Sequence, residues 1–341
     1  MHHNRTFMIF WMFACILLVI AMILLGGATR LTESGLSIVE WRPLTGILPP
    51  LTDVSWAKEF EHYKTFPEYR FKHMGLSMEG FKFIFYMEYS HRLLGRLLGL
   101  IFILPLFFIW KNLSPHLKKQ FGILCIVGCL QGVMGWFMVK SGLVHNPYVS
   151  HYRLAAHLFL AFVLLALFMK TLLILFPQPR LFLPQSMIYL NRFILCLVIM
   201  TIIYGAFVAG LRAGKLYNTF PTMGGDWIPV EIFFEKPFWI NFFENPVTVQ
   251  WIHRLFATLT FCCSLLFSLF LWWKNYKKES FLLFCFISVQ FLLGALTVIH
   301  IVPIPLALMH QGGSIILFLY VFFLNKRVCI LQTPHHIPVQ H

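Results

Sequence analysis

Eight long apolar stretches constrain the fold of this chain more than any other feature of its sequence. Each one can cross a hydrocarbon core of about 30 Å, because an α-helix rises about 1.5 Å per residue. They are continuous rather than alternating, which favours helices over the strands of a membrane β-barrel. The sequence therefore predicts an all-α integral membrane protein with eight transmembrane helices. The predicted spans are residues 7–27, 83–110, 120–140, 151–175, 189–211, 248–273, 280–299 and 303–324.

The composition excludes two other broad classes of protein. Hydrophobic residues make up 59% of the 341 residues and charged residues only 12%, whereas soluble domains carry about 25% charged residues. A soluble protein of this length could not bury so much apolar surface. Disorder is excluded as well, since 17% of the residues are aromatic and disordered chains are poor in aromatic side chains.

The distribution of charge predicts how the chain lies in the membrane. Lysine and arginine outnumber aspartate and glutamate by 27 to 13, a net charge of +14. Twelve basic residues lie at the termini and in or beside the loops after the second, fourth and sixth spans, where Glu279 is the one acidic residue. Because cytoplasmic segments carry the excess of lysine and arginine, both termini are expected in the cytoplasm. This sorting explains much of the charge without a nucleic-acid partner.

The first span lacks the features of a targeting sequence. No small-residue cleavage site follows it, and no segment rich in arginine and serine precedes it. This pattern indicates the inner membrane of a bacterial cell, with the inner membrane of a mitochondrion as the alternative.

Two long segments are expected on the opposite, outer side of the membrane. They cover residues 28–82 and 212–247, and both are rich in proline, glycine and tryptophan. This composition indicates ordered loops rather than flexible linkers. Residues Val54–Tyr63 are expected to form a short amphipathic helix that lies over the outer face.

An internal repeat divides the chain into two halves. The order of one span, a long outer loop and three further spans occurs twice, and Glu88–Leu93 resembles Gln250–Leu255 at an offset of 162 residues. Gln131 and Gln290 correspond at an offset of 159 residues. We therefore expect two pseudo-symmetric four-helix bundles, formed by residues 1–180 and 181–341.

Four of the fifteen histidines lie inside even-numbered spans. His91, His157, His253 and His310 are each six to eight residues from the outer end of their predicted span, so one pair lies at matched depth in each bundle. Ionisable residues inside a membrane are functional candidates because an unpaired polar group there is costly. Two neutral imidazoles facing each other across a bundle suit the axial positions of a haem iron. A zinc ion would need further ligands, and a structural hydrogen bond between helices is the other alternative.

The residues beside two of these histidines suggest further roles. Arg92 and Arg254 directly follow His91 and His253, and a guanidinium suits the carboxylate of a haem propionate. Snorkelling to the outer interface is compatible with that role. Glu88 lies one turn before His91, where it could relay protons, stabilise developing positive charge or pair with Arg92. The second half has Gln250 at the equivalent position, which suggests chemistry in the first bundle and a permanent cofactor in the second.

Cysteine and nucleotide motifs limit the chemistry. None of the eight cysteines lies in a predicted outer loop, so no disulfide is expected there. The sequence has no Cys-x-x-Cys-His motif, so a haem would be bound non-covalently. It also has no dinucleotide fingerprint, so electrons must come from a donor other than a bound nicotinamide.

Several motifs along nearly the whole chain closely resemble haem A synthases. Among them the chain resembles the mitochondrial and alphaproteobacterial branch, because the other branch carries a cysteine pair in the first outer loop. The matching motifs are GGATRLTESGLS at 26–37, EWRPLTGILPP at 40–50, EYSHR at 88–92, FPTM at 220–223, WIHR at 251–254 and HQ at 310–311.

The resemblance implies an oxidoreductase of haem biosynthesis. Such an enzyme oxidises the C8 methyl group of haem O to the formyl group of haem A, by successive hydroxylations and loss of water, and its product serves haem–copper terminal oxidases. Haem b would be the resident cofactor on His253 and His310. Haem O, with its long farnesyl tail, would lie between His91 and His157, with Glu88 beside the reacting edge. The electron donor would be a quinol or a ferredoxin-like protein, and haem O synthase a candidate for substrate handover.

Two other functions compete with this interpretation. A cytochrome-b-like carrier that oxidises quinol would hold two permanent haems. A transporter built on a repeat would have broken helices and a site at mid-membrane, but the polar residues here lie nearer the outer face. The chain is expected to form a homo-oligomer through a small-residue face that includes Gly128, Gly132 and Gly135.

Overall fold

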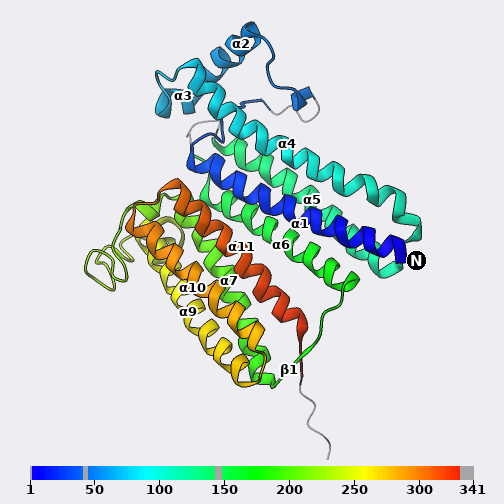
Figure 1. Ribbon diagram of the computed structural model, residues 1–341. Helices are drawn as coiled ribbons and strands as arrows, with labels where there is room; N and C mark the ends of the chain where they lie inside the picture. The colour runs from blue at the N-terminus through cyan, green and yellow to red at the C-terminus, as the bar shows by residue number, and fades with distance from the viewer. Residues whose placement is uncertain (1, 41–44, 143–147, 331–341) are drawn as a thin grey trace, which may run out of the picture.

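The computed structural model describes residues 2–40, 45–142 and 148–330 (Figure 1). Eight of its helices are long and apolar enough to cross a membrane, which confirms the predicted all-α membrane fold. Their ends lie within a few residues of the predicted spans. These eight helices are α1 (His2–Leu31), α4 (Met78–Ile109), α5 (Pro115–Gly142), α6 (His151–Leu175), α7 (Gln185–Gly210), α9 (Pro246–Trp273), α10 (Lys277–Ile299) and α11 (Ile304–Arg327).

The long helices form two groups that follow the chain order. Helix α1 packs against α4 and α6, and α5 packs against α6. In the second half, α7 packs against α9 and α11, and α10 packs against α9 and α11. The groups meet where α6 lies against α7 and α1 against α11, and a continuous apolar core runs through both.

The two ends of this assembly differ (Figure 1). One end, called here the loop end, carries the long segments 32–77 and 211–245. The other, called the terminal end, carries the N-terminus and a small parallel sheet in which β1 (Leu181–Leu183) pairs with β2 (Val328–Ile330). This sheet ties the connection between the halves to the end of α11.

The first long loop contains the helix expected at residues 54–63. It is α2 (Asp53–Lys64), which begins with a capping box between Thr52 and Ser55 and is followed by α3 (Pro67–Lys72). Trp56 of α2 packs edge-on against Phe85 of α4, with ring centroids 5.0 Å apart. This contact explains why α4 begins five residues earlier than predicted, since its first turns are covered by α2 rather than by lipid.

The second long loop folds around short helical turns and polar anchors. Helix α8 (Asn241–Glu244) precedes α9, and Asn245 caps α9 by accepting hydrogen bonds from the N–H groups of Val247 and Thr248. Within this loop the Asn241 side chain bonds the backbone N–H and carbonyl of Glu235. In their described residues both loops are therefore ordered, as their composition predicts.

Close contacts fix how the two groups of helices meet. At the loop end, a Cβ atom added to Gly210 of α7 would lie 2.3 Å from the Cβ and 2.7 Å from the Cα of His151 on α6. Further into the assembly, the Gln311 amide of α11 donates to the Ile23 carbonyl of α1 over 2.9 Å. Arg212 and Glu33 form an ion pair between the two long loops.

We predict that Gly210→Ala destabilises the protein, because the added methyl group would collide with the backbone of α6. Overpacking of this kind typically costs about 1–3 kcal/mol. Gly122→Ala is the matched control, since nothing lies within 4 Å of an added Cβ there and alanine favours a helix. Thermal unfolding of the purified protein in detergent should show a lower midpoint for Gly210→Ala alone. An unchanged midpoint would contradict the close α6–α7 contact.

Candidate functional site

The structure places the four predicted histidines on alternate helices of the two groups. His91 is on α4 and His157 on α6; His253 on α9 and His310 on α11 repeat the arrangement. Each half therefore carries its two histidines on different helices of the same group. That the two rings of a pair face one another across a bundle stays a prediction.

The first helix of each half supports one imidazole in the same way. An added Cβ on Gly26 of α1 would lie 3.1 Å from His91 Nε2, and one on Gly205 of α7 would lie 3.2 Å from His253 Cε1. His253 Nδ1 also lies 3.0 Å from the Thr201 carbonyl. Gly205 follows Thr201 by four positions, which is one helical turn.

The other imidazole of each pair has a second repeated frame. An added Cβ on Gly135 would lie 3.1 Å from His157 Cε1, and the same atom on Gly294 would lie 2.9 Å from His310 Cε1. One turn before each glycine is a glutamine. Gln131 Nε2 lies 3.5 Å from His157 Nε2, and Gln290 Nε2 lies 3.2 Å from His310 Nδ1.

These surroundings fit a haem better than a zinc ion. The Thr201 carbonyl can accept the Nδ1 proton of His253, which leaves Nε2 as the metal-binding nitrogen. His157 Nδ1 is buried without a hydrogen-bond partner, as expected of a ring whose surroundings are incomplete without a ligand. Within the described residues no three His, Cys, Asp or Glu side chains gather as a metal site. The paired imidazoles could therefore serve as the two axial ligands of a haem, with space left by the glycines behind them. The described residues add no further ligands that would complete a zinc site.

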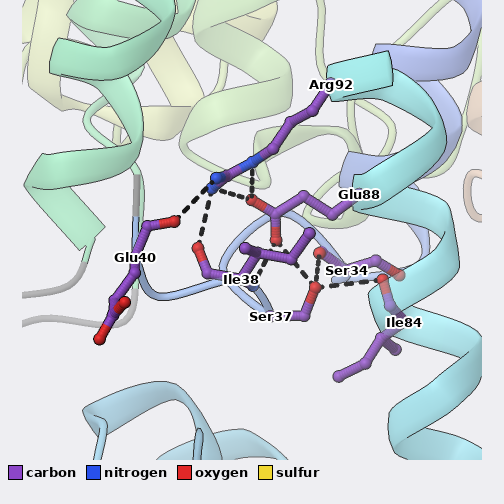
Figure 2. Close-up of polar contacts among 7 residues, drawn as sticks. All are labelled: Ser34, Ser37, Ile38, Glu40, Ile84, Glu88 and Arg92. Carbon is purple, nitrogen blue, oxygen red and sulfur yellow. Dashed lines mark hydrogen bonds and ion pairs between the residues drawn. The ribbon is translucent and has the colours of Figure 1, made fainter. Parts of the chain in front are cut away.

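Glu88 joins α4 to the first long loop (Figure 2). Its side chain is only 3% exposed. One carboxylate oxygen accepts hydrogen bonds from the Ser37 hydroxyl and the Ile38 N–H, both 2.8 Å long. The other accepts from Arg92 Nε at 3.0 Å and Nη2 at 2.6 Å. Arg92 also donates to the carbonyls of Ile38 and Glu40, so this network fixes the loop directly above His91.

Arg254 performs the same anchoring in the second half. Its guanidinium donates to the carbonyls of Tyr217, Thr219 and Thr222 in the second long loop, while its Nε is buried without a partner. Gln250, which replaces Glu88, donates to the Tyr217 carbonyl over 3.0 Å. Both arginines are therefore occupied by loop carbonyls, and their contact with haem propionates stays a prediction.

Sequence reasoning missed the residues that give the imidazoles their room. Gly26 lies within a quoted motif and Gly135 within the small-residue face expected to contact another molecule. For Gly135 that expectation is wrong, because its Cα faces the His157 ring. The repeat itself held the signal: Gly135 and Gly294 have the same 159-residue offset as the two glutamines.

A buried acid in the first loop was also missed. Glu68 of α3 is 2% exposed and accepts a hydrogen bond of 3.1 Å from the Tyr63 hydroxyl, which lies 2.7 Å from His73 Nδ1. Burial raises the pKa of Glu68 to about 8, although Lys72 opposes the shift. The pKa of His73 is lowered, again mainly by burial. Nothing in the local sequence distinguishes Glu68 from an exposed loop residue.

Taken together, the fold and the position of the four histidines define a class: a multi-pass helical membrane protein with two histidines inside the long helices of each half. Residues 9–322 match the COX15-CtaA family, described as cytochrome oxidase assembly protein. The chain belongs to this family.

Curated relatives cover most of the chain. A heme A synthase of Wolbachia pipientis subsp. Culex pipiens is 44% identical over 320 residues, covering 90% of this chain and 93% of the relative. Heme A synthases of Nitrosospira multiformis and Rhodopseudomonas palustris are 45% and 44% identical, over 93% and 91% of this chain and 92% and 87% of the relatives.

We predict that the α2–α3 segment becomes less stable as the pH rises from about 4.5 to about 8. The folded pKa of Glu68 lies above its ordinary value of 4.5, so the folded state binds this proton more tightly. Its stabilisation is complete below the unfolded pKa and is lost as the pH rises through the folded pKa, with a limiting slope of about 1.4 kcal/mol per pH unit. Amide hydrogen exchange in residues 53–72 measures this dependence.

Glu68→Gln should flatten that profile, because the amide does not titrate. Glu61→Gln on α2 is the control, since Glu61 has a side chain that is 70% exposed, and it should keep the wild-type profile. A pH dependence that survives in Glu68→Gln would assign the effect to another group.

Proposed function

We propose that this chain is a haem A synthase that oxidises the C8 methyl group of haem O to a formyl group. The observation that carries the proposal is the pair of glycine-backed bis-histidine sites in a chain that matches the family over residues 9–322. The names of the curated relatives support the same reaction. The product, haem A, would serve haem–copper terminal oxidases.

The two sites divide the work in this proposal. Residues 181–341 would hold haem b as a resident cofactor on His253 and His310, with Arg254 near its propionates. Bound there, haem b would supply one-electron transfer. Residues 1–180 would take haem O between His91 and His157, with Arg92 near its propionates. Thr201 would keep His253 in the tautomer that presents Nε2, as its 3.0 Å contact with Nδ1 supports.

Glu88 is the proposed acidic group beside the reacting edge of haem O. Its carboxylate already accepts four hydrogen bonds from the loop and from Arg92. A carboxylate held in this way can stabilise positive charge that develops on a nearby substituent without moving. It also keeps the loop closed over His91 and excludes water from the site. Gln250 offers the loop an amide but no charge, which suits a site that only holds a cofactor.

Imidazoles on both faces of the iron would leave no axial position for dioxygen. An electron-transfer route to the oxidised methyl group therefore suits these residues better than oxygenation at the iron. The donor in this proposal is a quinol or a ferredoxin-like protein, and haem O synthase is a candidate for substrate handover.

The proposed location is the bacterial inner membrane, with the mitochondrial inner membrane as the alternative, and the charge distribution supports an orientation with both termini in the cytoplasm and the loop end outside. Twelve basic residues and the single acid Glu279 lie at or near the terminal end. Glu279 itself pairs with Arg327 over 2.9 Å, so this acid adds little free negative charge there.

The competing functions have less support. The family and its relatives do not favour a quinol-oxidising electron carrier. A transporter would be expected to have helices broken at mid-membrane, and the eight long helices are continuous over their described residues.

We predict that the four histidines separate into two phenotypes. His253→Ala and His310→Ala should lose the resident haem, because one imidazole cannot replace two axial ligands. His91→Ala and His157→Ala should keep that haem and produce no haem A. Expression with a haem O source, followed by extraction and chromatography of the bound pigments, measures both effects. Loss of the same haem from all four variants would contradict the division between the halves.

We predict that Glu88→Gln keeps bound haem and reduces haem A formation by at least about tenfold, equivalent to about 1.4 kcal/mol in the barrier. Ser37→Ala is the matched control, because it removes the hydroxyl that contacts Glu88 and the carbonyls of Ser34 and Ile84 in the same network and retains the carboxylate. Limited proteolysis of the first loop reports whether the anchor is intact. Normal haem A production by Glu88→Gln would remove Glu88 from the reaction, and equal losses in both variants would reduce its role to holding the loop.

A further inference from the structure

The two halves differ at one seam between neighbouring helices. In the second half, α9 and α10 pack along their length. Phe261 and Phe291 stack across this seam with ring centroids 4.5 Å apart, and the Ser268 and Ser280 hydroxyls bond the opposite backbone carbonyls near its terminal end. The site of His253 is therefore closed on this side.

The corresponding helices of the first half, α4 and α5, make no comparable contact in the described part of the chain. Phe102 and Phe121 approach across this seam towards the terminal end, with ring centroids 6.3 Å apart. Between residues 89 and 101 of α4, and between 125 and 141 of α5, no side chain is buried. The seam is therefore open over the half of the bundle that holds His91 and His157.

The repeat identifies what opens the seam. The 162-residue offset that relates His91 to His253 places Gly99 at the position of Phe261. The 159-residue offset that relates Gln131 to Gln290 places Gly132 at the position of Phe291. Nothing lies within 4 Å of an added Cβ on either glycine. The two phenylalanine rings that close the second bundle thus correspond to glycines, which have no side chain, in the first bundle.

The open seam is continuous with the proposed substrate site. Gly132 is next to Gln131, whose amide lies 3.5 Å from His157 Nε2, and one turn from Gly135, which faces the same ring. Gln131 Oε1 and His157 Nδ1 are buried there without hydrogen-bond partners. Away from the ring the neighbouring side chains Leu97, Leu130 and Val133 are apolar and exposed. The seam therefore runs from polar atoms at an imidazole to a surface suited to lipid.

We infer that this seam, the α4–α5 slot, binds the isoprenoid tail of the substrate haem. The inference rests on the proposed function. A farnesyl chain needs an apolar path from the porphyrin edge into the bilayer, and the slot provides one beside His157. Haem b has no such tail and needs no such path, which agrees with a second bundle that is closed by Phe261 and Phe291. The slot thus determines which haem each half accepts. A second copy of the chain could cover the same face, but would not require continuity with His157.

Gly132→Phe tests the slot, because it restores the ring that the second half carries. Haem O and haem B are titrated separately into the purified protein in lipid nanodiscs, with the resident haem in place, and binding is followed by the Soret band. Haem O should bind about tenfold more weakly than to the wild type, and haem B should change by less than about twofold. Leu266→Phe is the matched control, since Leu266 of α9 is 62% exposed and lies outside the slot, and this variant should bind both haems like the wild type.

The reverse exchange gives a second measurement. Phe291→Gly should open the α9–α10 seam, so that haem O replaces part of the haem b retained by this variant, as chromatography of the extracted pigments would show. Two results would contradict the inference that the slot binds the tail. Gly132→Phe could weaken the binding of haem O and haem B equally, or it could change the binding of neither. A change of oligomeric state with unchanged haem affinities would also overturn the inference, and would assign the face to a protein contact.

These outcomes are distinct from failure of the proposed function. A wild type that neither binds nor converts haem O would refute the function itself. A wild type that converts haem O, together with a Gly132→Phe variant that binds it equally well, would refute only the slot.

Discussion

Each of the four imidazoles inside the helical bundles lies against a glycine of a neighbouring helix, and the rest of the site depends on this contact. A methyl group at any of these glycines would approach the ring to about 3 Å, closer than packed carbon atoms normally come. The glycines let the histidine-bearing helices come close while each ring stays directed into the bundle. For three of the rings the same helix turn also supplies a polar group in contact with an imidazole nitrogen, from Thr201, Gln131 or Gln290. At His253 the Thr201 carbonyl accepts from Nδ1, so there the same short segment fixes both position and tautomer.

Both halves share this frame, and they differ at a few positions that bear on their proposed roles. The first half has Glu88 where the second half has Gln250, so the charge near the neighbouring histidine differs. The arginine that anchors each loop is present in both halves. The second half has stacked rings at Phe261 and Phe291, whereas the first half has Gly99 and Gly132 at the corresponding positions. The first bundle is therefore less closed to lipid. Both differences lie in the first half, which is where the proposed substrate site is. The second half is the more enclosed of the two, as expected for a cofactor that stays bound.

The eight spans and the four histidines could be predicted from the sequence because both depend on local properties. A helix that crosses lipid needs a long apolar run, and a histidine within such a run is conspicuous. The helix contacts were less accessible. In a membrane the lipid-facing side of a helix is as apolar as its buried side, so periodicity does not show which neighbour it meets. The open α4–α5 seam and the role of Gly135 both depend on that information. Glu68 was missed for a related reason, since its burial results from tertiary contacts around Tyr63.

Gln311 connects the two sites physically. It directly follows His310, and its amide bonds the Ile23 carbonyl of α1 over 2.9 Å. An added Cβ on Gly27 would lie 1.9 Å from its Oε1, so α1 and α11 are locked together beside Gly26, the glycine behind His91. A shift of α11 on loading His310 would therefore be transmitted to the wall of the other site. The two halves are therefore joined mechanically at this point, because the helix that carries His310 and the helix behind His91 cannot move independently here.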